Sequence, residues 1–112
     1  MLGAMAEPSQ LADAEALESR LASGDFLLFK HSQYCPISAR AFEQYCRFAA
    51  HHAELATAWI DVTGQRPLSR LVEERTGIRH ESPQAILFRD GLPIWNASHG
   101  EITTESLAQA LA

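Results

Sequence analysis

The chain has 112 residues, of which 46% are hydrophobic and 21% are charged, a composition typical of one globular domain. It carries 14 acidic and 9 basic side chains, a formal net charge of -5, and no cluster of Lys or Arg forms a basic face. Because nucleic acid binds to basic surfaces, the composition argues against such a partner. No apolar run is long enough to cross a bilayer, so we expect no membrane partner either.

Residues 1–8 lack the basic start and long apolar middle of a secretory signal. We expect them to form a flexible N-terminus ahead of a single domain over 9–112. Without an export signal, the expected location is the reducing cytoplasm, where thiols stay free. The two cysteines, Cys35 and Cys46, are too few for a disulfide framework. The five histidines are scattered and no Cys-x-x-Cys motif is present, so we predict no metal site and no bound cofactor.

Hydrophobic periodicity and turn signals divide the chain into eight predicted elements. In chain order these are a helix over about 10–22 capped by Ser9, a strand over 26–31, a helix from Pro36 to about 52, a strand over 57–62, a helix from Pro67 that ends at Gly77, a strand over 84–88, a strand over 92–97, and a final helix capped by Thr103. The dipeptide Asp90-Gly91 predicts a hairpin between the last two strands.

The element order αβαβαββα predicts an α/β fold. The first βαβ unit should be parallel and right-handed, and the closing ββ pair antiparallel. We therefore expect a four-stranded mixed sheet flanked by helices, which is the thioredoxin-like fold with one additional N-terminal helix.

Cys35 stands where the strand over 26–31 gives way, through a polar turn, to the helix that begins at Pro36. Free N–H groups and the positive end of the helix dipole stabilise an anion there, so a thiol at this position loses its proton more readily than free cysteine. Proline suits the first helical turn because it has no N–H to leave unpaired. A buried, inert cysteine is the alternative. We favour a reactive thiol, because such turns open at the ligand-binding edge of the sheet.

Ser38 decides the kind of chemistry, because a dithiol reductase needs a second cysteine three residues after the first. A serine hydroxyl can donate a hydrogen bond to the Cys35 thiolate but cannot form a disulfide; the alternative for Ser38 is a solvent-facing helix position. Cys46 lies farther along the same predicted helix, at a rise of roughly 16 Å. A disulfide needs Cα atoms within about 7 Å, so Cys46 is predicted to be a core residue and the site to be monothiol.

Ser82-Pro83 precedes the third predicted strand. It could be an ordinary trans bond. In a thioredoxin-like fold, however, we expect a cis-proline beside the active cysteine, with the preceding residue offering backbone groups to an extended substrate. Lys30 is predicted to hold a carboxylate of a bound thiol ligand and to favour the thiolate. His31 either shares that role or has none, and Asp61, Trp95 and His99 are predicted to be structural.

Three segments of the chain carry a resemblance to a known family. They are Phe29-Lys30-His31-Ser32, Cys35-Pro36-Ile37-Ser38-Ala39 and His80-Glu81-Ser82-Pro83-Gln84-Ala85. Together they closely resemble the monothiol bacilliredoxins of the YtxJ (BrxC) type, and the likeness runs from Ser9 onward. The resemblance implies a thioredoxin-like fold, Cys35 as the active cysteine, and a redox role with bacillithiol as the co-substrate. Tyr34 departs from the pattern, in which threonine is expected above the sulfur.

Residues and resemblance together predict a monothiol thiol–disulfide oxidoreductase that removes bacillithiol from protein mixed disulfides. Its partners would be bacillithiolated client proteins and the low-molecular-weight thiol. The alternatives are a glutaredoxin-like protein using another small thiol, a non-enzymatic iron–sulfur or redox binding protein, and a redox-inert adaptor. The predicted site residues are Cys35, Ser38 and Pro36 for catalysis, and Lys30, Tyr34, Ser82 and Pro83 for substrate binding.

Overall fold

The computed structural model describes residues 8–112. Its elements in chain order are β1 (Ser9–Gln10), α1 (Ala14–Leu21), β2 (Phe26–His31), α2 (Pro36–Ala50), β3 (Ala56–Asp61), α3 (Arg66–Thr76), β4 (Gln84–Arg89), β5 (Leu92–Ser98), the short 3-10 helix η1 (His99–Glu101) and α4 (Thr104–Leu111). The predicted flexible segment lies outside the described residues except for Pro8, whose carbonyl oxygen accepts a hydrogen bond from the indole N–H of Trp59 at 3.2 Å.

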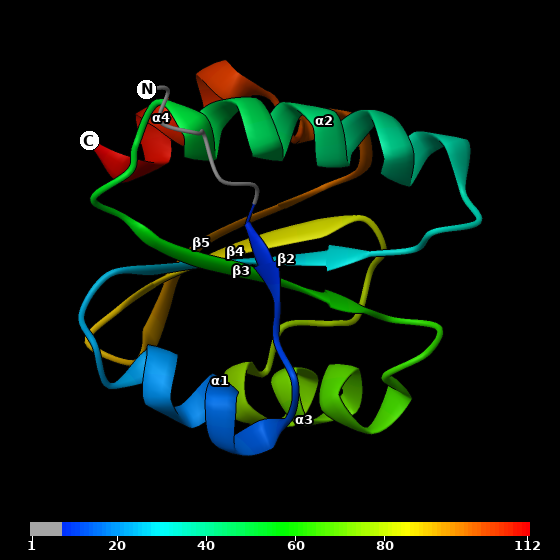
Figure 1. Ribbon diagram of the computed structural model, residues 1–112, viewed down its shortest axis with the longest axis vertical. Coiled ribbons are helices and arrows are strands. Elements are labelled where there is room, and N and C mark those ends of the chain that lie inside the picture. The colour runs from blue at the N-terminus through cyan, green and yellow to red at the C-terminus, as the bar shows by residue number, and fades with distance from the viewer. Residues whose placement is uncertain (1–7) are drawn as a thin grey trace.

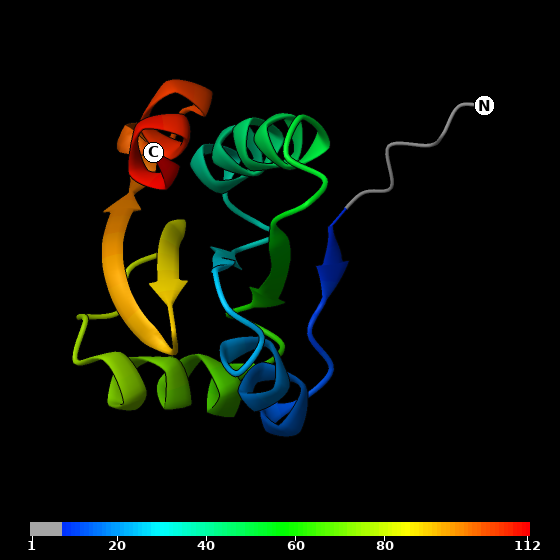
Figure 2. The same ribbon diagram turned by 90° about the vertical axis from the view of Figure 1, so that its left-hand side faces the viewer.

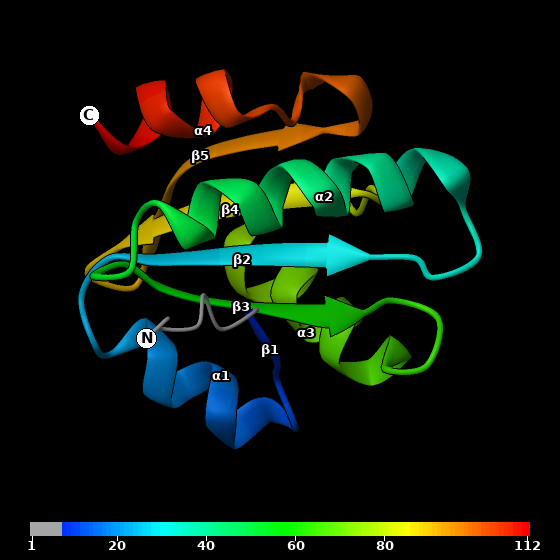
Figure 3. The same ribbon diagram turned by 45° about the horizontal axis from the view of Figure 1, so that its top comes forward.

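The five strands form one mixed sheet in the order β1-β3-β2-β4-β5, and helices cover both of its faces. Figure 1 shows α2 and α4 on one face and α1 and α3 on the other. Figure 2 shows the same two helical layers from the side, with the strands between them. At the centre, β2 lies between the parallel strand β3 and the antiparallel strand β4. Figure 3 shows α2 running alongside β2, with the turn that joins them (residues 32–35, the Cys35 turn) at the arrowhead end of β2.

Alternation of side chains along β2 builds two hydrophobic cores, one on each face of the sheet. Phe26 and Leu28 pack with residues of α1 and α3, whereas Leu27 and Phe29 pack with residues of α2 and α4. All six residues of β2 are buried, as expected for the central strand of a sheet covered on both faces. The alternation also sends the polar residues at the end of β2 to opposite faces, and this placement matters for the site below.

The largest difference from the sequence prediction lies before α1. Ser9 is not a helix cap, because it pairs with Ala58 in a parallel β1–β3 ladder. The helix begins later, where the carboxylate of Asp13 accepts a hydrogen bond from Ala16 N–H at 2.9 Å. Leu11 is buried and its N–H donates to the carbonyl oxygen of Trp59 at 2.8 Å, so the free edge of β3 holds this segment extended. The sheet therefore has five strands, not four.

The other predicted elements are confirmed, with ends shifted by one or two residues. Gly77 ends α3 in a left-handed conformation, with φ of 71°. Asp90 and Gly91 both have positive φ, as the predicted β4–β5 hairpin requires. Thr103 caps α4 and forms a capping box with Ser106. Over residues 8–112, no helix has the length and apolar character to cross a membrane.

Candidate active site

Three segments meet at the edge of the sheet where β2 and β3 end. The turn after β2 leads into α2, and the turn after β3 leads into α3. The start of β4 lies at the same edge, because Gln84 pairs with Lys30 in the antiparallel β2–β4 ladder. The first two turns are tied together where Val62 N–H donates to the carbonyl oxygen of His31 at 2.9 Å. This edge therefore brings together the segments in which the sequence places the reactive residues.

Cys35 occupies the N-cap position of α2, as predicted. Its backbone is extended, with φ of -116° and ψ of 120°, and Pro36 opens the 15-residue helix. Its carbonyl oxygen accepts the first helical hydrogen bond, from Ala39 N–H at 3.0 Å. The side chain is half-buried, and within residues 8–112 its sulfur makes no hydrogen bond. A partly exposed thiol thus lies at the positive end of a long helix, which is where a thiolate is stabilised.

Ser38 follows one turn later and is fully buried. Its Oγ accepts a hydrogen bond from Ser32 N–H at 2.9 Å and lies 2.8 Å from Nδ1 of His31. A buried hydroxyl proton needs an acceptor, and Nδ1 is the one that the described residues offer. Ser38 therefore donates to His31, whose own ring proton is on Nε2. The expected hydrogen bond from Ser38 to Cys35 is absent among residues 8–112, because the serine proton is used elsewhere.

His31 is more closely integrated into the site than the sequence suggested. Its ring stacks on Phe42, with centroids 4.4 Å apart, and meets the edge of Trp59 at 5.5 Å. Burial lowers the pKa of His31, and the nearby Asp61 only partly opposes that effect, so the ring is neutral at neutral pH. One signal pointed to this position: the alternation of β2 places His31 on the same face as Phe29, towards α2.

Lys30 lies on the opposite face of the sheet, beside α3. Its side chain is 0% exposed, and its ammonium donates to Oε1 of Gln84 at 3.0 Å. Burial lowers the pKa of Lys30 to about 8, although Glu73 and Glu81 act in the other direction. Direct contact with a ligand above Cys35 does not fit this placement. Gln84 in turn donates to the carbonyl oxygen of Arg79 at 3.1 Å, so the pair secures the loop before Pro83.

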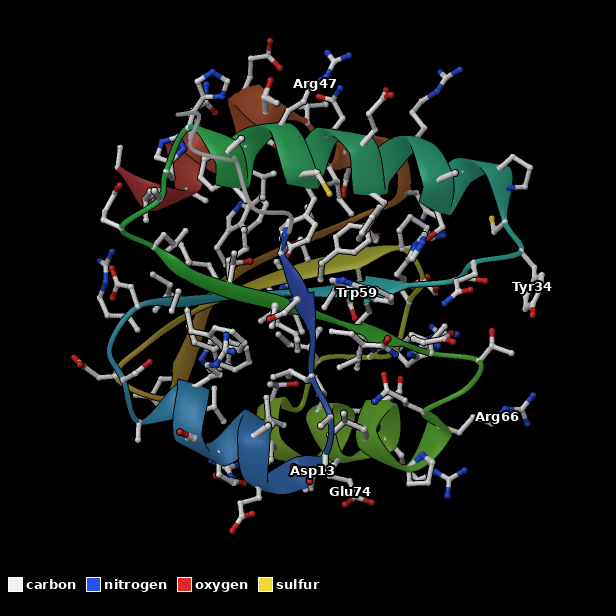
Figure 4. All side chains as sticks on the ribbon, viewed as in Figure 1. Asp13, Tyr34, Arg47, Trp59, Arg66 and Glu74 are labelled. Carbon is white, nitrogen blue, oxygen red and sulfur yellow. The ribbon has the colours of Figure 1, made fainter. Side chains whose placement is uncertain are left out.

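The Ser82-Pro83 peptide is cis, as expected, and Pro83 is buried immediately before β4. The carbonyl oxygen of Pro83 accepts a hydrogen bond from His99 N–H at 3.0 Å, which gives His99 the structural role predicted for it. The Oγ of Ser82 is buried and has no partner within residues 8–112. Tyr34, by contrast, is 84% exposed and projects from the molecule beside the Cys35 turn (Figure 4).

Two further predicted roles can be placed in the structure. Asp61 is a turn residue, because its carboxylate accepts a hydrogen bond from Thr63 N–H at 3.0 Å. Cys46 is half-buried and packs against the core between α2, α4 and the sheet. Within residues 8–112, no group of three or more His, Cys, Asp or Glu side chains is arranged to hold a metal ion. Among residues 8–112, Cys35 is the cysteine at this edge of the sheet, and a serine stands one helical turn later, where a dithiol reductase has its second thiol.

Comparison with known proteins identifies the family. The family model for the monothiol bacilliredoxin BrxC matches residues 7–107. The chain belongs to the monothiol bacilliredoxin family. The match covers both the Cys35 turn and the Ser82-Pro83 loop, and it confirms the resemblance seen in the sequence.

Solved structures place this bacilliredoxin in the thioredoxin-like superfamily. It is 34% identical to a proposed oxidoreductase with a thioredoxin fold, with a TM-score of 0.89 and 94% of each chain covered. It superimposes on thioredoxin from Trypanosoma brucei brucei with a TM-score of 0.80, at 12% identity over 99% of this chain and 93% of that one. For a mutant thioredoxin from Halobacterium salinarum NRC-1 the TM-score is 0.74, at 19% identity over 97% and 91% of the two chains. Family and fold together make this bacilliredoxin a thiol–disulfide oxidoreductase.

Proposed function

We propose that the protein removes bacillithiol from mixed disulfides with client proteins, with Cys35 as the nucleophile. The Cys35 thiolate attacks the bacillithiol sulfur, a Cys35–bacillithiol disulfide forms, and the client sulfur leaves as a thiolate that takes a proton from water. A second bacillithiol thiolate then attacks the bacillithiol sulfur of the adduct. This step releases bacillithiol disulfide and restores the Cys35 thiolate, so two exchanges balance without a bound cofactor.

The observation that carries this proposal is the half-buried thiol of Cys35 at the N-terminus of α2, with a serine one turn later. Ser38 stands where a resolving cysteine would be, and Cys46 lies farther along α2, where its half-buried side chain packs against the core. An adduct on Cys35 must therefore wait for a thiol from outside. We propose that Ser82 offers its backbone to the extended client chain and that Tyr34 forms the outer wall above the sulfur. The reaction needs a reducing environment, so the cytoplasm is the proposed location.

Mass spectrometry of the intact protein tests the proposal. Purified protein is incubated separately with bacillithiol disulfide and with glutathione disulfide, and the adduct is then mapped. We expect one bacillithiol per chain, on Cys35, in the wild type and in Cys46→Ser, and none in Cys35→Ser. A model protein carrying a bacillithiol mixed disulfide should lose it only when Cys35 is present. Release by Cys35→Ser would refute the mechanism, and a clear preference for glutathione disulfide would favour a glutaredoxin-like protein instead.

A further inference from the structure

A cavity of about 370 Å³ lies on the α3 side of the active-site edge, and no step of the proposed reaction uses it. The end of β3, the first turns of α3 and the loop before β4 form its walls. The polar residues among those that line it are Thr63, Arg66, Ser69, Arg70, Glu73 and His80. Its volume falls at the lower end of the range of small-molecule sites, which is about 300–1,000 Å³.

The charge of the cavity favours an anion. Arg66 and Arg70 are exposed and lie one turn apart on α3. Within residues 8–112 neither guanidinium is in an ion pair or a hydrogen bond. The acidic residue of the lining, Glu73, is engaged, because its carboxylate accepts a hydrogen bond from His80 N–H at 3.0 Å. Two unpaired arginines thus face one cavity in a chain whose net charge is -5.

The lining also suits one kind of anion in particular. A guanidinium binds a carboxylate through two parallel N–H donors, and two arginines one turn apart can hold a dicarboxylate. The hydroxyl of Thr63 adds a further possible donor at the rim. Ser69 is held in place, since its Oγ lies 3.3 Å from Nδ1 of His80.

The cavity and the turn that carries Cys35 lie at the same edge of the sheet. The lining residue His80 belongs to the loop that ends in the Ser82-Pro83 peptide. The turn that carries Thr63 is tied to the Cys35 turn by a hydrogen bond of 3.4 Å from Nε2 of Gln33 to Oδ2 of Asp61. Figure 4 shows the side chains of Tyr34 and Arg66 at the same end of the molecule. A small molecule with its sulfur at Cys35 could thus extend past the turn after β3 towards Arg66.

We propose that this cavity binds the carboxylate-bearing end of the small thiol whose sulfur reacts with Cys35, with Arg66 and Arg70 holding the carboxylate. The inference rests on the proposed function and adds the part of the protein that selects the thiol. Cys35 supplies the chemistry, which any accessible disulfide can undergo. The arginines supply the preference for a disulfide that carries carboxylates.

The test compares three disulfides with the wild type, Arg66→Gln, Arg70→Gln and the double variant. Bacillithiol disulfide and glutathione disulfide carry carboxylates, whereas hydroxyethyl disulfide is neutral. The rate of adduct formation on Cys35 is followed by mass spectrometry. We expect the double variant to react at least ten times more slowly with the carboxylate-bearing disulfides and at an unchanged rate with hydroxyethyl disulfide. A loss confined to bacillithiol disulfide assigns the cavity to bacillithiol, and a loss with both assigns it to carboxylate-bearing thiols in general.

Arg47→Gln is the matched control for each single variant, because Arg47 is an exposed arginine on the outer side of α2 and its replacement removes one positive charge, as each single variant does. It should react like the wild type with all three disulfides. Unchanged rates in the double variant, or equal losses with the neutral disulfide, would overturn the inference. If wild-type Cys35 reacted with no disulfide, the proposed function would fail instead. Calorimetry with malate, a small dicarboxylate, would then test the cavity by itself. Binding of malate to the wild type that is lost in the double variant supports the carboxylate site, and no binding to the wild type refutes it.

Discussion

Nδ1 of His31 accepts the hydroxyl proton of Ser38 across a distance of 2.8 Å, and this bond keeps the serine from the neighbouring thiol. The two residues come from different elements, the last position of β2 and the first turn of α2. In N-cap geometry, side chains at the N-cap and N3 positions face one another, so Ser38 is suitably placed to donate to Cys35. Which of its two neighbours receives the proton therefore depends on His31.

Replacing His31 with Phe should make Cys35 more reactive. Phenylalanine keeps an aromatic ring against Phe42 but accepts no proton, so the buried Ser38 hydroxyl would turn to the Cys35 thiolate. A hydrogen bond to a charged group contributes about 1.5–3 kcal/mol, which corresponds to roughly tenfold or more thiolate at mildly acidic pH. Iodoacetamide should alkylate Cys35 about ten times faster in His31→Phe than in the wild type at pH 6.

The double variant His31→Phe with Ser38→Ala is the control for this prediction. Cys35 should not be alkylated faster in this double variant than in the wild type, because no hydroxyl remains to donate to the sulfur. Faster alkylation that persists in the double variant would mean that His31 acts on Cys35 without Ser38. Equal rates in the wild type and His31→Phe would show that Ser38 does not turn to the sulfur.

Ser38→Cys should convert the monothiol site into a dithiol one. Residues three apart on a helix have Cβ atoms about 5–6 Å apart, close enough for a disulfide after a small adjustment. In a Cys46→Ser background, the variant should expel bacillithiol from its Cys35 adduct. The intact mass should then fall to that of the reduced, unmodified variant minus two hydrogens, because one bacillithiol leaves and a disulfide forms between Cys35 and the introduced cysteine. An adduct that lasts as long as in the Cys46→Ser parent would contradict the proximity of the two positions.

Replacing Lys30 with Met should increase the free energy of unfolding, compared with the wild type, by more at neutral pH than at high pH. The pKa of Lys30 is about 8 in the folded chain and 10.5 in the reference state, so the unfolded chain binds more protons between these values. Wild-type stability from this group therefore rises with pH from about 8 to 10.5 and is lowest below pH 8. The full penalty is on the order of 3 kcal/mol. Methionine removes that penalty but also the hydrogen bond to Gln84.

Urea unfolding at pH 7 and pH 9.5 measures this difference. The free energy of unfolding of Lys30→Met, minus that of the wild type, should fall by about 1–2 kcal/mol between the two pH values. Arg47→Met, which removes an exposed cation, should show no such trend. The difference in free energy of unfolding between Lys30→Met and the wild type could instead be the same at both pH values. That result would mean that burial does not disfavour the charged form of Lys30.

Much of the fold followed from local patterns. The apolar run of β2, the Asp90-Gly91 turn and the Thr103 cap each depend on neighbouring residues, so their elements were predicted within one or two residues. The segment around Ser9 was mispredicted for a different reason. Leu11 fits an amphipathic helix equally well, and only the free edge of β3 gives its N–H a partner in an extended conformation.

The sequence by itself determined the chemistry that we propose for the site, because that chemistry depends on residue types at short spacing. A cysteine followed by proline at a helix start, with serine one turn later and no second thiol in reach, already describes a monothiol nucleophile. The tertiary structure decided which side chains surround it. Strand alternation turned Lys30 towards α3 and His31 towards Ser38, and the turn after β3 placed Arg66 and Arg70 of α3 at the same edge. Arg66 and Arg70 are distant from Cys35 in sequence, so only the packing of the sheet against its helices brings them to the same edge.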